Sequence, residues 1–115
     1  MVVDRRQVSR ERRASRRIKA VFAVKKTVGT RVQLGQAEDI GPTGMTVRRP
    51  KDGGLPANTP VSLTFELPGT AEPIAADGVV INDVRAGIFR RTGVRFIGLR
   101  PEHQRLIASY CRRSG

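Results

Sequence analysis

Six short segments of this chain alternate apolar and polar side chains, and this alternation constrains the fold more than any other feature of the sequence. The clearest segment ends before the turn signal Pro68-Gly69 and has apolar residues at every second position: Val61, Leu63, Phe65 and Leu67. We predict strands over 18–24, 30–34, 44–48, 61–67, 74–81 and 89–96. Short strands at a spacing of roughly ten residues are typical of an antiparallel barrel or sandwich.

The pattern changes after residue 100, where a helix is predicted over 101–112. Pro101 suits the first helical position, Glu102 suits the positive end of the helix dipole, and Arg112 suits the negative end. The apolar stripe of this helix consists of Leu106, Ile107, Tyr110 and Cys111. We expect His103, on the same helix, to be exposed to solvent. The predicted fold is therefore mainly β, with one C-terminal helix.

Charge is concentrated at the N-terminus. The chain carries a formal net charge of +12, and the run Arg12-Arg13-Ala14-Ser15-Arg16-Arg17 directly precedes the first predicted strand. Residues 1–17 have no helical or strand period, so we interpret them as a flexible basic arm and 18–115 as the folded domain. A segment this basic predicts an anionic partner, such as a nucleotide, a nucleic acid, an acidic protein or a membrane surface. Arginine forks favour phosphate groups and aromatic ring faces.

No residue set supports catalysis or metal binding. The chain has a single histidine, His103, and a single cysteine, Cys111, which cannot build a closed metal site or a recognisable catalytic arrangement. We therefore expect no catalytic residue, no metal, no cofactor and no enzymatic activity. One cysteine excludes an internal disulfide, and no apolar run reaches the length of a membrane span or a signal-peptide core. A cytoplasmic location is the simplest expectation.

Two motifs stand in order along the chain. The first is Arg13-x-x-x-Arg17, and the second is Asp39-x-Gly41-x-x-Gly44. The second motif by itself fits an ordinary strand–turn–strand connection, because Asp, Gly and Pro form turns. Together with Gly93-Val94-Arg95-Phe96-Ile97-Gly98-Leu99, the two motifs resemble the PilZ domain, a bacterial receptor module for cyclic di-GMP. The resemblance covers roughly residues 10–112 and selects the Arg13/Arg17 frame, because Ile18 starts the strand directly after it.

This resemblance implies a six-stranded antiparallel Greek-key barrel whose arm folds over the ligand. Arg13 and Arg17 would bind phosphates and the guanine Hoogsteen edge, Asp39 would accept hydrogen bonds from guanine, and Gly44 would permit a close backbone approach or a positive φ. Arg12 would influence whether one nucleotide or a stacked pair binds. The chain departs from the family at Gly41, where the family has serine, so one hydroxyl contact is missing.

The leading hypothesis is a stand-alone cyclic di-GMP effector in which the ligand orders residues 5–17 and alters a surface that binds an unidentified protein partner. The alternative is a degenerate PilZ-like module that binds protein and no nucleotide. Nucleic-acid binding is less favoured, because a stacking platform needs exposed aromatics, and Phe22, Phe65 and Phe96 fall on core-facing positions. An arm that binds anionic membrane would lack an amphipathic apolar face.

Overall fold

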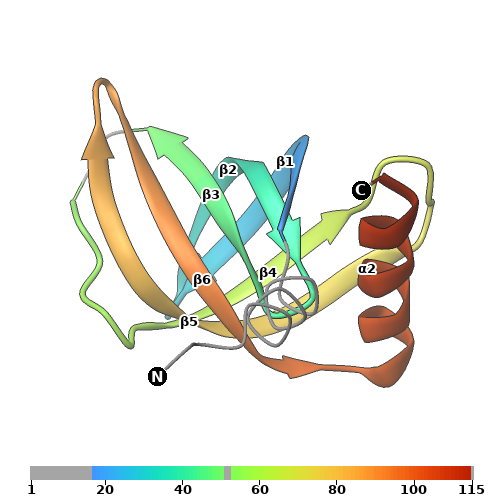
Figure 1. The fold of residues 1–115 in the computed structure, drawn as a ribbon. Coiled ribbons are helices and arrows are strands. Elements are labelled where there is room, and N and C mark those ends of the chain that lie inside the picture. Colours follow the sequence, from blue (N-terminus) through green and yellow to red (C-terminus); the bar gives the residue numbers. More distant parts are fainter. Residues whose placement is uncertain (1–16, 51–52, 115) are drawn as a thin grey trace, which may run out of the picture.

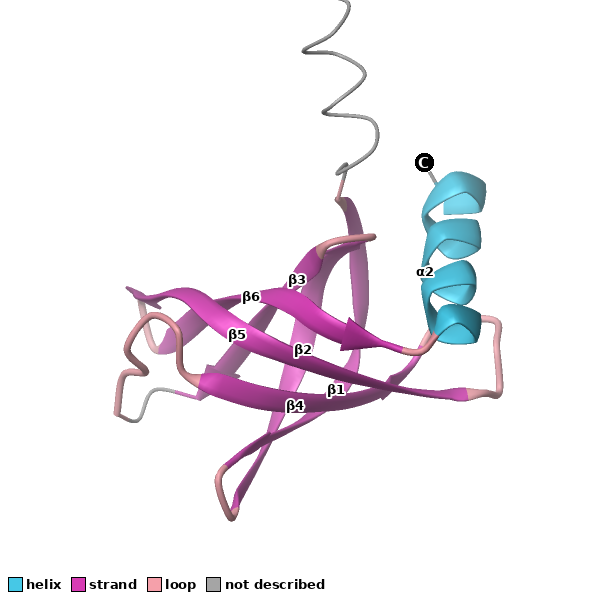
Figure 2. Ribbon diagram, turned by 90° about the horizontal axis from the view of Figure 1, so that it is seen from below, coloured by secondary structure: helices cyan, strands magenta, loops and turns pink. Residues whose placement is uncertain are grey.

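Six antiparallel strands close into a barrel in the computed structural model, which describes residues 17–50 and 53–114. The strands are β1 (Ile18–Val28), β2 (Arg31–Gly41), β3 (Gly44–Pro50), β4 (Pro60–Glu66), β5 (Pro73–Ala86) and β6 (Phe89–Leu99). The helix α2 (Pro101–Ser114) follows β6 and stands beside one end of the barrel, as Figures 1 and 2 show. The mainly β fold and its single C-terminal helix are confirmed for the described residues.

The strand order around the barrel is β1-β2-β3-β6-β5-β4. Three consecutive strands pair as neighbours, and β4 then crosses over to pair with β1, which is the connection of a Greek key. The β5–β6 hairpin completes the barrel, because β6 pairs with β3 and β5 pairs with β4. The alternating pattern allowed a barrel or a sandwich, and the structure is a closed barrel.

The core lies inside the barrel and follows the predicted alternation. Every second residue of β4 is buried, and the intervening residues Ser62, Thr64 and Glu66 are exposed. The start of β1 shows the same period, with Ile18, Ala20, Phe22 and Val24 buried. The rings of Phe22 and Phe65 meet at 5.4 Å between centroids, so the two strands contribute to one core.

Several strands are longer than predicted. The second strand was expected to span 30–34, yet β2 continues to Gly41, and β5 continues to Ala86. The end of β2 is kept extended by neighbours on both sides: Asp39, for example, pairs with Lys19 of β1 and with Thr46 of β3. The end of β5 is kept extended by its pairing with β6. The turn between β2 and β3 is reduced to Pro42-Thr43.

The prediction that His103 is solvent-exposed is wrong. His103 is 5% exposed, and its Nδ1 lies 3.4 Å from both the nitrogen and the carbonyl oxygen of Ala75. It precedes the fully buried Ile107 by four residues, so the two side chains share the face that packs on the barrel. The predicted stripe is otherwise only partly buried at Leu106, Tyr110 and Cys111.

A buried charge network lies where β3, β5 and β6 meet. The side chains of Arg49 and Asp83 are 2% and 1% exposed, and Arg49 Nη2 lies 2.8 Å from Asp83 Oδ2. Asp83 also accepts hydrogen bonds from the Leu55 backbone at 2.6 Å, from the Thr92 hydroxyl at 2.8 Å and from Arg90 at 3.1 Å. Burial alone would raise the pKa of Asp83, but these donors and the Arg49 charge hold it below its ordinary value.

Candidate functional site

The structure brings together predicted site residues that are far apart in the sequence. Arg17 directly precedes β1, Asp39 and Gly41 lie at the end of β2, and Gly44 begins β3. Arg12 and Arg13 lie outside the described residues. The described part of the site is therefore built on the β2–β3 hairpin and the start of β1.

The side chains of Arg17 and Asp39 form the charged centre of this site. Arg17 Nη1 lies 3.5 Å from Asp39 Oδ1, and each side chain is 31% exposed. The same Arg17 nitrogen donates to the Thr46 hydroxyl at 3.2 Å, and the Thr46 backbone N–H donates to Asp39 Oδ1 at 3.0 Å. A cation and an anion are thus held side by side at a surface that a ligand can reach.

The register of the hairpin explains why these groups share the outer face. Ile40 pairs with Met45, and both side chains are fully buried in the core. The flanking pairs, Asp39 with Thr46 and Gly41 with Gly44, therefore face away from the core, because side chains alternate along a strand. The two glycines add no side chain beside Asp39, and both are themselves buried.

Gly44 is required by a close backbone approach. A Cβ at this position would lie 2.2 Å from the Val94 carbonyl oxygen of β6 and 2.9 Å from Arg17 Nη2. Positive φ angles occur at Gly29, Gly69 and Gly87, and Gly44 is not one of them. Of the two reasons that the sequence left open for this glycine, steric proximity is therefore the one that applies.

A family model settles the relationship that the motifs indicated. The model of the PilZ domain matches residues 11–113, which is most of the chain. The chain belongs to the PilZ family. No curated protein sequence matches it significantly.

Solved PilZ-containing structures share the fold at low sequence identity. The Bacillus subtilis inhibitor of motility MotI/DgrA is 18% identical, with a TM-score of 0.77 over 84% of this chain. The PilZ domain of Escherichia coli YcgR, determined with c-di-GMP, is 20% identical, with a TM-score of 0.64 over 89% of this chain and 93% of that domain. MrkH from K. pneumoniae, in a c-di-GMP complex, is 17% identical with a TM-score of 0.70, and 96% of this chain and 52% of MrkH are covered. The chain spans about half of MotI/DgrA, 48%.

Two residues of this PilZ domain beside the motif were not identified from the sequence. Thr46 contacts both Arg17 and Asp39, and Arg95 of β6 is exposed and pairs with Gly44. The period of two places Thr46 on the same face as Gly44, so the sequence carried a signal for it. No local signal connects Arg95 to Gly44, because their pairing joins strands about fifty residues apart.

The helix α2 contacts the site strand β2 through Cys111, whose thiol is not a reactive group. The Cys111 thiol lies 3.6 Å from the carbonyl oxygen of Ile40, the residue after Asp39. Burial raises the pKa of this thiol, so it stays protonated and poorly nucleophilic at neutral pH. Within residues 17–50 and 53–114, no cluster of His, Cys, Asp and Glu side chains could hold a metal ion.

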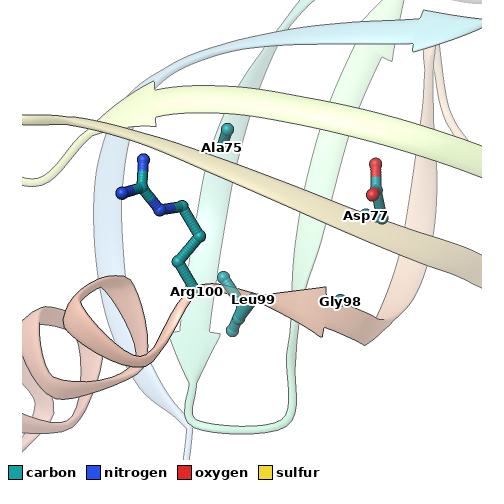
Figure 3. Close-up of a pocket in the computed structure, with 5 residues that line it drawn as sticks. All are labelled: Ala75, Asp77, Gly98, Leu99 and Arg100. Carbon is teal, nitrogen blue, oxygen red and sulfur yellow. The ribbon is translucent and has the colours of Figure 1, made fainter.

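A separate pocket of about 420 Å³ is lined by residues of β5 and β6 and by Arg100, which lies between β6 and α2. Figure 3 shows Arg100 and Asp77 at opposite sides of this pocket, with Ala75, Gly98 and Leu99 between them. It shares no residue with the Arg17–Asp39 site. The described motif residues therefore lie at the β2–β3 hairpin and directly before β1, and none of them lines this pocket.

Proposed function

We propose that this PilZ domain is a non-enzymatic receptor for cyclic di-GMP. The observation that carries the proposal is the convergence of Arg17, Asp39 and the close-packed Gly44 at the β2–β3 hairpin and the start of β1. These groups come from three segments of the sequence, and a strand-forming role alone would not require an arginine and an aspartate to be half-exposed and adjacent. The family membership and the c-di-GMP-bound structures of other PilZ proteins support the same ligand.

The groups present match the chemistry of guanine. A carboxylate such as Asp39 accepts hydrogen bonds from the N1–H and N2–H donors of the base, and an arginine fork donates to O6 and N7 or to phosphate oxygens. A half-exposed ion pair is worth about 0–1 kcal/mol, so a ligand can rearrange the Arg17–Asp39 contact at low cost. Arg95, on the strand next to Gly44, places a further cation beside this face.

The N-terminal arm would complete the site. Arg12 and Arg13 would bring further guanidinium groups to the phosphates, and binding would order the part of residues 5–17 that precedes Arg17 over the barrel. A protein partner would then bind the surface that the ordered arm has changed. This arm movement and this partner belong to the proposal and rest on the positive charge of residues 1–17 and on the position of Arg17 at the site.

Isothermal titration of cyclic di-GMP into the full chain tests the proposed ligand. We expect Arg17→Ala to weaken binding roughly 10- to 100-fold, because a hydrogen bond to a charged group contributes about 1.5–3 kcal/mol. Arg13→Ala should weaken binding in the same direction. Arg105→Ala, which removes an equal charge from an exposed position of α2, should leave the affinity almost unchanged.

Selectivity distinguishes a guanine site from a general anion site. Cyclic di-AMP and GTP should bind far more weakly than cyclic di-GMP. Wild-type protein that releases no heat with cyclic di-GMP at physiological salt would contradict the proposed ligand. Equal losses for Arg17→Ala and Arg105→Ala would instead indicate non-specific charge attraction.

A protein-interaction module that binds no nucleotide is the second candidate. Gly41 lacks the family hydroxyl, and several apolar side chains are exposed on the barrel, including Leu34 at 73% and Ile88 at 77%. A nucleic-acid platform has less support, because Phe22 and Phe65 are buried and cannot stack on bases. Within the described residues, no helix has the length and apolar content needed to cross a bilayer.

A further inference from the structure

Thr46 links the two charged residues of the site. It faces outward from β3 directly across from Asp39, its backbone N–H donates to Asp39 Oδ1 at 3.0 Å, and its hydroxyl accepts from Arg17 Nη1 at 3.2 Å. Arg17 Nη1 reaches Asp39 itself only at the longer distance of 3.5 Å. The shorter of the two contacts that hold this arginine nitrogen is therefore the one to Thr46.

The hairpin supplies no hydroxyl from its neighbouring outward position. Gly41 stands two residues after Asp39 on the same face, where the family motif has serine. We propose that Thr46 is the positioning residue of this site: its hydroxyl keeps the Arg17 guanidinium beside Asp39 in the geometry that receives the nucleotide. The inference rests on the proposed function and assigns a role to a residue outside both motifs.

The physical gain is preorganisation. An arginine side chain has many rotamers, and immobilising such a side chain during binding weakens affinity by an amount that corresponds to roughly three- to tenfold in Kd. An arginine already held by the Thr46 hydroxyl loses less freedom when the ligand arrives. The Asp39 carboxylate is fixed independently, because the Thr46 backbone N–H is present whatever side chain this position carries.

Three threonine variants separate this role from the β-strand preference of threonine. Thr46→Val removes the hydroxyl and keeps the shape, the branching and the backbone N–H, whereas Thr46→Ser keeps the hydroxyl. Thr64→Val makes the same change at an exposed position of β4, away from the hairpin. We expect cyclic di-GMP to bind about three- to tenfold more weakly to Thr46→Val, while Thr46→Ser and Thr64→Val stay within about twofold of wild type.

Arginine side-chain NMR of the free full-length protein tests the same contact without ligand. Rotation of the Arg17 guanidinium should be slowed in wild type, Thr46→Ser and Thr64→Val, and fast in Thr46→Val. Unchanged Arg17 dynamics in Thr46→Val would overturn the proposal, and so would unchanged affinity. Wild-type protein that fails to bind cyclic di-GMP would refute the ligand and with it the role of Thr46 in binding, and the NMR comparison would still show whether Thr46 holds Arg17. Thermal unfolding of all variants checks that Thr46→Val is folded at the temperature used.

Discussion

Replacing Asp83 with alanine is expected to lower the free energy of unfolding by about 3–5 kcal/mol, the usual cost of leaving a buried charge without its partner. The Asp83 side chain is 1% exposed, and its loss would remove the carboxylate that Arg49 Nη2 contacts at 2.8 Å. The Leu55 backbone N–H and the Thr92 hydroxyl would lose their acceptor as well. Chemical denaturation at pH 7, followed by circular dichroism, measures this difference.

Asp77→Ala is the matched control on the same strand. Asp77 is exposed and accepts one hydrogen bond, from Ser62 at 3.1 Å, so its replacement should change the free energy of unfolding by less than about 0.5 kcal/mol. Similar costs for the two aspartate variants would show that the Asp83 network contributes little to stability. The Asp83 variant should retain any affinity for cyclic di-GMP at temperatures where it remains folded, because the network contains none of the proposed ligand-binding residues.

The same carboxylate makes stability depend on pH in the acid range. Since the pKa of Asp83 in the folded protein is below its ordinary value of 3.8, the stabilisation from the ionised network is fully present above that value. It is lost as the pH falls through the lower pKa of the folded state. The stability difference between wild type and Asp83→Ala should therefore be largest near neutral pH and shrink below pH 3.8.

Replacing Gly44 with alanine is expected to damage both stability and ligand binding. The added Cβ would lie 2.2 Å from the Val94 carbonyl oxygen, a backbone atom, so β3 and β6 must move apart at a cost of about 1–3 kcal/mol. The same methyl group would lie 2.9 Å from Arg17 Nη2 and displace the guanidinium from Asp39. Because both partners of the site move, we expect affinity for cyclic di-GMP to fall by tenfold or more, about 1.4 kcal/mol.

Gly53→Ala provides the comparison for this glycine. A Cβ at Gly53 would meet no atom within 4 Å, and Gly53 does not have a positive φ. Denaturation and calorimetry on both variants separate a general effect of glycine replacement from a local clash. Wild-type affinity and stability in Gly44→Ala would show that β3 and β6 have more room than the structure assigns to them.

The sequence pattern was sufficient to predict those features that depend only on residues close together in the chain. The period of two in 18–24 and 61–67 correctly predicted which side chains enter the core, because a strand alternates its faces whatever sheet it joins. The Asp, Gly and Pro residues of 39–44 indicated a strand–turn–strand connection, and the structure confines its turn to Pro42-Thr43. The family motifs also pointed to Arg17 and Asp39, whose adjacency the structure then provided.

Tertiary structure decided the features that depend on which segments become neighbours. His103 was expected to face solvent, but the position of α2 against β5 buries it beside Ala75. Thr46 became part of the site through the register that sets it across from Asp39, and Arg95 came beside Gly44 through the β3–β6 ladder. The sequence by itself determined the faces of the strands and the motif residues. The pairing of distant strands and the docking of α2 determined the burial of His103 and the positions of Thr46 and Arg95 at the site. Hydrogen bonds between strands that are far apart in the chain have no local signature in the sequence.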